Sequence, residues 1–183
     1  PTAGPSLVPL GVVPTATPEL ERITTRTWDL FGEHVRYAAP GCKAASFPDT
    51  FAILRALEQG GPQAMEVDVH GDAPNPSVPP SVGIMMMAHV LLLLMRTPPP
   101  YTLSLPLIKS YSDKWWKQEG QATIRAGIQD MSTRNQLIQQ LGIDAADLDQ
   151  TGDALATRAV YGLVAKKLLR IQRTGGAANV RFA

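Results

Sequence analysis

The sequence predicts an all-α fold: a single helical-bundle domain of six to eight helices with an extended N-terminal arm and a short C-terminal tail. The first observation is residues 82–95, V-G-I-M-M-M-A-H-V-L-L-L-L-M, which carry no charge. A helix of that length spans about 21 Å, short of the roughly 30 Å hydrocarbon core of a bilayer, so we expect a buried central helix. The second observation is that most other segments combine helix-start residues with apolar residues at helical spacing.

The N-terminal arm, residues 1–16, has four prolines and no charge. The prolines exclude a helix and favour an extended chain. A disordered tail is normally polar, whereas an uncharged arm with apolar side chains is suited to a groove of its own chain or of a neighbouring copy. The alternative to a groove-binding arm is a flexible, unbound terminus. The candidate subunit-interface residues of the arm are Leu7, Val8, Leu10, Val12 and Val13.

Helices follow the arm. Thr17 is the predicted N-cap of the first helix, with Pro18 at its first position. A second helix is expected over Asp49–Gln59, stopped by the glycines at 60–61. The alternating segment Met65–His70 predicts one short strand within a proline-rich loop.

Beyond the central helix, Ser104 predicts a helix start, and Pro106 is tolerated in its first turn. Further helices are expected over Gln121–Met131 and Ser132–Gly142. Apolar residues at helical spacing then predict a long last helix over Gly152–Arg173.

The glycines at 175–176 are the expected end of that helix. The predicted organisation is therefore an arm over 1–16, a helical core over 17–175 and a tail over 176–183.

The composition predicts a folded protein without strong polyanion bias, since the net charge is +1 and the pI about 8.4. Only 18% of residues are charged, below the roughly 25% of average soluble proteins, which hints at surface covered by other protein. The single cysteine, Cys42, excludes an internal disulfide. No targeting or membrane-spanning segment is visible, so we expect a cytosolic protein that does not bind membranes.

Catalytic signatures are absent from the sequence, which contains no phosphate-binding loop, nucleophile elbow or zinc motif. The histidines at 34, 70 and 89 are far apart, and His89 is expected to be a hydrogen-bonded core residue. The acidic residues between 144 and 153 lack the spacing of a calcium loop. We therefore expect no enzyme, no metal and no cofactor, with catalysis by Cys42 as a remote option.

Basic residues gather late in the chain. From Gly152 to residue 183 the sequence contains six basic residues and one acidic residue, Asp153. On a helix Lys166, Arg170 and Arg173 share one face and form a ridge that could grip phosphates. Complementation of the helix dipole is an equally weighted alternative. The candidate nucleic-acid-binding residues are Arg125, Arg134, Arg158, Lys166, Lys167, Arg170 and Arg173.

The tryptophans at 115 and 116 stand between two lysines in K-W-W-K, which could stack nucleic-acid bases. Adjacent helical residues point in different directions, so the alternative places one tryptophan in the core and the other at the surface. Which of the two is exposed stays open at this point.

The segment T-A-T-P-E-L-E-R-I-T-T-R-T-W, Thr15 to Trp28, resembles the A-T-P-E-x-[I/L]-x-x-I-x-x-x-W opening of the first core helix in coat proteins of flexible filamentous, potexvirus-like plant viruses. The stretch D-A-L-A-T-R-A-V-Y-G-L, followed by R-x-x-R-T-G-G, also resembles the closing helix of rigid rod-shaped virus coats. The potexvirus-like F-A-A-F-D block is absent, so no RNA-contacting residue is assigned by the resemblance. The resemblance implies N-terminal arms that dock on neighbouring subunits and a basic groove that holds single-stranded RNA.

The resulting hypothesis is a virus coat (nucleocapsid) protein that self-assembles into a helical filament around nucleic acid, with single-stranded RNA as the expected partner. We expect to find it in the virion, and in the host cytoplasm before assembly. The rival hypothesis is a helical protein-interaction or scaffold module that binds no nucleic acid. Charge reversal in the last helix separates the two hypotheses, because only the first predicts a loss of nucleic-acid retention.

Overall fold

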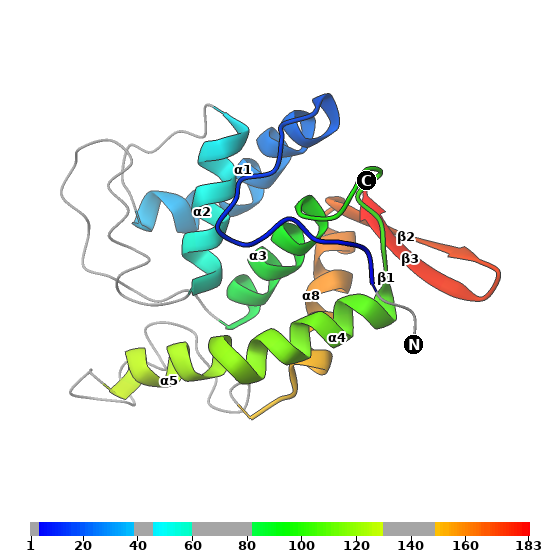
Figure 1. Cartoon of the computed structure of the whole chain (residues 1–183). Coiled ribbons are helices and arrows are strands. Elements are labelled where there is room, and N and C mark those ends of the chain that lie inside the picture. The colour runs from blue at the N-terminus through cyan, green and yellow to red at the C-terminus, as the bar shows by residue number, and fades with distance from the viewer. Residues whose placement is uncertain (1–3, 39–45, 60–81, 130–148) are drawn as a thin grey trace.

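The computed structural model of the chain describes residues 4–38, 46–59, 82–129 and 149–183 (Figure 1). Most of this part is helical, and a small antiparallel sheet is added at one side. The elements in chain order are α1 Pro18–Ala38, α2 Phe47–Gln59, α3 Val82–Met95, β1 Leu103–Ser104, α4 Leu105–Trp115, the π-helix η2 Trp116–Gly120, α5 Gln121–Gln129, α8 Gly152–Ala165, β2 Leu169–Thr174 and β3 Ala177–Phe182.

Helix α3 is the centre of the core, as its uncharged sequence predicts. Its bounds, Val82 to Met95, are the predicted ones, and most of its side chains are buried. It packs against α2 on one side and α8 on another, while α4 crosses below it (Figure 1). Among the described residues, no helix is both long and apolar enough to cross a membrane.

Polar caps set the starts of the outer helices. Oγ1 of Thr17 accepts a hydrogen bond from the backbone N–H of Leu20 at 3.2 Å, so the predicted cap of α1 is confirmed. Ser104 caps α4 in the same way, by accepting from the N–H of Leu107 at 3.3 Å. Helix α2 begins at Phe47, two residues before the predicted start.

A long helical rod forms the lower side of the molecule, because α4, η2 and α5 follow one another without a break (Figure 1). The π-helical turn contains Gly120, and a Cβ at this position would lie 2.8 Å from ring atoms of both Trp115 and Trp116. Close packing of the two indoles over this backbone therefore requires glycine. Trp116 is buried and donates its Nε1–H to the carbonyl oxygen of Gln150 at 3.0 Å.

The predicted last helix over 152–173 is wrong in its extent, because α8 ends at Ala165. The N–H of Lys167 donates to the carbonyl of Val164 at 2.9 Å, and the N–H of Leu168 donates to that of Leu163 at 3.0 Å. This pair of bonds is a Schellman helix end, with Lys167 in the left-handed conformation (φ 63°) that glycine usually supplies. The chain then reverses into strand β2.

The predicted tail over 176–183 is likewise wrong, because it forms strand β3. Gly175 and Gly176 have φ of 59° and 82°, the two positive values of a type I′ hairpin turn, so they join two strands instead of ending a helix. Strand β3 lies between β1 and β2, with Leu103 opposite Val180 and Leu169 opposite Phe182. The helical core therefore ends at Ala165, and a hairpin follows it.

Two predicted elements fall on parts of the chain that the structure does not describe. These are the helix over Ser132–Gly142 and the short strand over Met65–His70.

Candidate nucleic-acid interface

The hairpin and the turn before it present five basic residues, which we call the hairpin basic group: Lys166, Lys167, Arg170, Arg173 and Arg181. All are exposed except Arg181, which is half-buried. None of them forms an ion pair with an acidic side chain in the described part of the chain. The positive charge of this group is therefore not compensated by described neighbours.

The two sides of the hairpin differ in polarity. Strand residues alternate between faces, and Leu169, Ile171, Val180 and Phe182 lie on the face that packs on the core. The opposite face carries Arg170 and Gln172 from β2 and Asn179 and Arg181 from β3.

Helix α1 adds basic side chains at the base of the hairpin. Nη1 of Arg22 and Nη1 of Arg26 each donate to the carbonyl oxygen of Ala183 at 3.3 Å. Nη2 of Arg26 also donates to the carbonyl oxygen of Lys167. These contacts hold the turn after α8 and the end of β3 against α1. Neither Arg22 nor Arg26 was identified from the sequence, because the pairing of α1 with residue 183 is a tertiary contact.

The predicted helical ridge of Lys166, Arg170 and Arg173 does not exist. Lys166 caps α8, and the other two residues lie on β2, where an odd spacing places them on opposite faces. The structure nevertheless keeps Lys166, Lys167, Arg170 and Arg173 within one short segment. Arg181 lies outside the predicted helix and is not among the residues that helical spacing selects. The pair G-G between alternating residues is a hairpin signal that places Arg181 opposite Arg170.

The remaining candidates lie elsewhere. Arg125 of α5 forms an ion pair with Asp149, with Nη2 and Oδ1 3.1 Å apart. Arg158 of α8 donates to Oε1 of Gln150 at 3.3 Å. Arg134 falls outside the described residues.

The N-terminal arm lies on its own chain and crosses α3 towards β1 (Figure 1). The N–H of Val8 donates to the carbonyl of Arg96 at 2.9 Å, and Nε of Arg96 donates back to the carbonyl of Val8 at 2.7 Å. Leu7 packs against the core, and Leu10 is half-buried. Val12 and Val13, in contrast, are 53% and 45% exposed. These two valines are large hydrophobic side chains of the arm that remain exposed to solvent.

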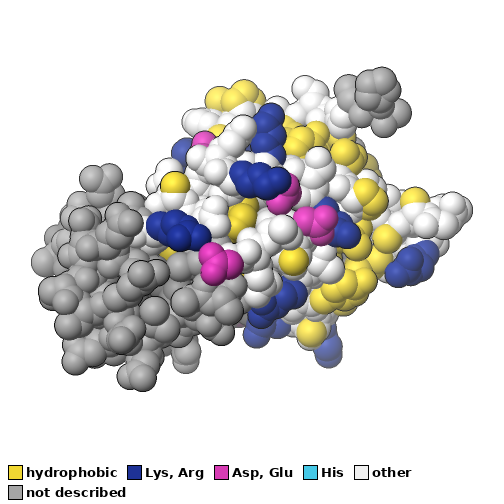
Figure 2. All heavy atoms as spheres, turned by 90° about the horizontal axis from the view of Figure 1, so that it is seen from below, with side chains coloured by type: hydrophobic (Ala, Val, Ile, Leu, Met, Phe, Trp, Pro, Cys, Tyr) yellow, Lys and Arg dark blue, Asp and Glu magenta, His cyan; other side chains and the backbone are white. Residues whose placement is uncertain are grey.

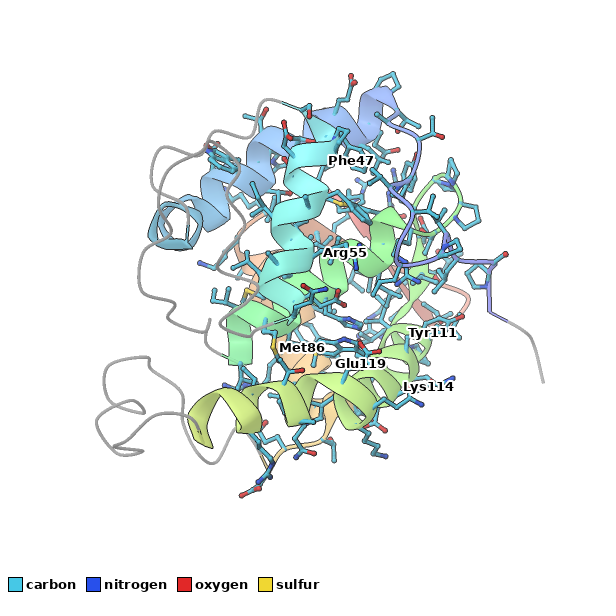
Figure 3. All side chains as sticks on the ribbon, turned by 60° about the vertical axis from the view of Figure 1, so that its left-hand side comes forward. Phe47, Arg55, Met86, Tyr111, Lys114 and Glu119 are labelled. Carbon is cyan, nitrogen blue, oxygen red and sulfur yellow. The ribbon has the colours of Figure 1, made fainter. Side chains whose placement is uncertain are left out.

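A buried polar pair lies at the centre of the core. Nδ1 of His89 donates to Oε1 of Glu58 at 2.6 Å, and the indole of Trp115 stacks on the imidazole with ring centroids 4.2 Å apart. Figure 3 labels Arg55 on α2, Met86 on α3 and Tyr111 on α4, the three helices that carry this group. The predicted core role of His89 is confirmed. Both partners are less than 5% exposed, so this pair does not face solvent.

The charge of Glu58 also acts on Arg96, the residue that holds the arm. Burial lowers the pKa of the Arg96 guanidinium, the negative Glu58 raises this pKa, and the positive Arg55 lowers it. The buried carboxylate therefore partly offsets the effect of burial on the guanidinium that binds Val8.

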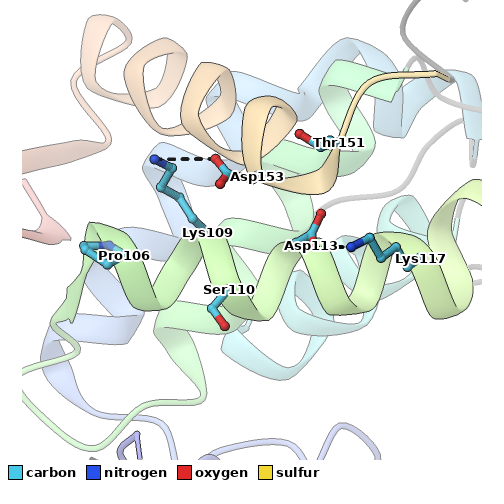
Figure 4. A pocket seen from close by; sticks show the side chains of 7 residues that line it. All are labelled: Pro106, Lys109, Ser110, Asp113, Lys117, Thr151 and Asp153. Atoms are coloured by element: carbon cyan, nitrogen blue, oxygen red, sulfur yellow. Dashed lines mark ion pairs between the residues drawn. The ribbon is translucent and has the colours of Figure 1, made fainter. Parts of the chain in front are cut away.

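A pocket of about 400 Å³ lies between α4 and the start of α8 (Figure 4). It is lined by Pro106, Lys109, Ser110, Asp113, Lys117, Thr151 and Asp153. Its charges pair within the pocket: Lys109 is 3.5 Å from Asp153, and Lys117 is 2.8 Å from Asp113. Acidic and basic side chains also stand next to one another across the face on which α4 lies (Figure 2).

The carboxylate of Asp113 is held ionised in that pocket. The hydrogen bond from Lys117 lowers its pKa most, and backbone N–H groups of Asp153 and Gly152 lower it further. The partial positive charge at the N-terminus of α8 is therefore compensated by the carboxylate of Asp113. The pocket is less suited to an anionic ligand than the hairpin basic group.

Metal-binding groups are also absent from the described part: no three His, Cys, Asp or Glu residues there are arranged to hold an ion. Cys42 and His70 lie outside the described residues. Comparison of the chain with protein-family models, with curated proteins and with solved structures found no match.

Proposed function

We propose that the chain is a structural coat protein that assembles with copies of itself around nucleic acid, and that its hairpin basic group contacts the nucleic-acid backbone. The observation that carries the proposal is the uncompensated charge of that group. Lys166, Lys167, Arg170, Arg173 and Arg181 lie within one hairpin and form no ion pair in the described part of the chain. Clusters of this kind bind phosphates without reading sequence.

Single-stranded RNA is the proposed partner. The overall charge of +1 gives little long-range attraction, so each subunit would bind weakly through its local cluster. Repetition along one strand multiplies such weak contacts, because binding of each further subunit is effectively intramolecular. A protein whose positive charge is confined to one local cluster is therefore suited to bind nucleic acid as a polymer of many subunits.

Self-assembly is proposed to use the arm. Val12 and Val13 are exposed apolar residues next to a segment that is fixed by the Val8–Arg96 hydrogen bonds. A contact between these valines and a different surface of the next copy is heterologous. Such a contact grows into a helical filament when the rotation between copies does not close into a ring, which is the case we propose. The proposal includes the six to eight helices expected for the whole domain. It places the protein in the virion, and in the host cytoplasm before assembly.

The proposal is tested by the nucleic acid that the protein retains after expression and purification. We expect the wild-type protein to carry RNA, and a variant with Lys166, Lys167 and Arg173 changed to glutamate to carry little. Charge reversal of Lys114, an exposed residue of α4, is the matched control. Equal RNA retention by all three proteins, or none by the wild type, would favour the rival interaction module.

A further inference from the structure

Arg170 and Arg181 stand directly opposite each other on β2 and β3. Like charges at such a cross-strand pair repel and destabilise the hairpin. Neither arginine has an acidic partner among the described residues, and Nε of Arg181 is buried without a hydrogen-bond partner there. A repulsive pair with an unsatisfied buried donor is expected where an anion binds between the two guanidinium groups.

The next pair along the same face is Gln172 opposite Asn179. Residues two apart on a strand share a face and lie about 6.8 Å apart along it. Side-chain amides both donate and accept hydrogen bonds, whereas guanidinium groups only donate. One face of the hairpin thus places a pair of cations beside a pair of groups that can bind neutral polar atoms.

More positive charge lies beyond the arginine pair. Ala183 follows two residues after Arg181, and its carbonyl oxygen accepts from both Arg22 and Arg26. The charged end of the polar face is therefore at the base of the hairpin, and the amide pair lies towards the turn at Gly175.

We propose that Arg170 and Arg181 together bind one phosphate of a single-stranded nucleic acid, and that Gln172 and Asn179 bind polar atoms of the adjoining nucleotide. This inference rests on the proposed function and adds the position of the phosphate. A phosphodiester fits because its oxygens match the fork of guanidinium donors. A single strand fits because its base edges are unpaired and open to side-chain amides.

The test measures binding of a short fluorescent oligouridylate by anisotropy over a range of salt concentrations. We expect Arg170→Gln and Arg181→Gln each to weaken binding about tenfold. The double variant should bind little more weakly than either single variant, because both side chains hold the same phosphate. Its slope of log affinity against log salt should be smaller by about 0.7, the value for one phosphate of a single strand.

A control for loss of charge is the double variant Lys109→Gln/Lys114→Gln on α4, which should keep the salt slope of the wild type. Gln172→Ala/Asn179→Ala should weaken binding without changing that slope, because the amides are uncharged. Folding is checked by thermal unfolding, in which Arg170→Gln should unfold at a higher temperature than the wild type because a repulsion is removed.

Each outcome separates the inference from the proposed function. If the wild type binds and the Arg170/Arg181 double variant keeps the wild-type salt slope, the proposed phosphate position is overturned and the proposed function stands. Losses that multiply in the double variant would show two independent phosphates and also overturn it. Equal binding of duplex RNA would overturn the single-strand assignment. Failure of the wild type to bind any oligonucleotide would overturn the proposed function itself.

Discussion

Nδ1 of His89 lies 2.6 Å from Oε1 of Glu58, and both side chains are buried in the helical core. The pair joins α3 to α2, and the stacked Trp115 adds α4. An otherwise apolar helix is thereby fixed in its rotation, because only one orientation of α3 places Nδ1 of His89 against Oε1 of Glu58.

Removal of the carboxylate should destabilise the protein. Glu58→Ala leaves the Nδ1–H of His89 buried without an acceptor, so we expect the free energy of unfolding to fall by about 3 kcal/mol. Glu58→Gln keeps an acceptor oxygen and should lose only about 1 kcal/mol. Urea unfolding measures both. Equal stabilities of the alanine and glutamine variants would contradict the role of this hydrogen bond.

The central helix and the helix starts could be predicted from the sequence because their signals are local. Fourteen uncharged residues leave few alternatives to a buried helix, and Thr17 and Ser104 cap helices through bonds three residues away. The core position of His89 follows from its apolar surroundings. Its partner, Glu58, is thirty-one residues away and is not indicated by any local pattern.

The predicted last helix is too long because Lys167, at the true helix end, takes a left-handed conformation that its residue type disfavours. With glycine at 167 the helix end would have been visible in the sequence. The alternation on both sides of Gly175 and Gly176 was the available signal for a hairpin. The contributions of Arg22 and Arg26 could not be predicted, since they depend on how α1 packs against the end of the chain.

Close packing of α8 on α4 depends on Gly152. A Cβ at this position would lie 2.5 Å from Cα of Asp113 and 2.7 Å from the carbonyl oxygen of Ser112. We expect Gly152→Ala to lower the free energy of unfolding by about 2 kcal/mol, because backbone must move. Gly83→Ala on α3 meets nothing within 4 Å and should raise it by roughly 0.5 kcal/mol. Chemical denaturation of both variants tests the contrast, which a loss at Gly83 or none at Gly152 would refute.

Glycine substitutions at the two neighbouring lysines at the end of α8 should change the free energy of unfolding in opposite directions. Lys167→Gly should raise the free energy of unfolding by roughly 0.5 kcal/mol, because glycine adopts a φ of 63° without steric conflict. Lys166→Gly, at a φ of −84°, should lower it by a similar amount. Both variants lose one positive charge and should weaken RNA binding alike. Thermal unfolding and anisotropy together test this pair, and equal stability changes would refute it.

Acid sensitivity is expected at Asp113. Its pKa is lowered in the folded protein, mainly by Lys117, so its stabilising effect is complete above the unfolded pKa of about 3.9. That effect declines as the pH falls from there and is lost once the pH is below the folded-state pKa. Asp113→Asn should therefore be less stable than wild type at neutral pH and similar to it in strong acid. Asp149→Asn, at an exposed ion pair, is the control; parallel pH curves for Asp113→Asn and wild type would contradict the expectation.

The most direct test of the coat-protein proposal is negative-stain electron microscopy of the purified protein, with the ratio of absorbance at 260 and 280 nm read on the same sample. The proposal predicts filaments with a ratio typical of nucleoprotein, both lost when Lys166, Lys167 and Arg173 are changed to glutamate. Monodisperse particles with a protein-like ratio, over a range of salt concentrations and with RNA added, would contradict it.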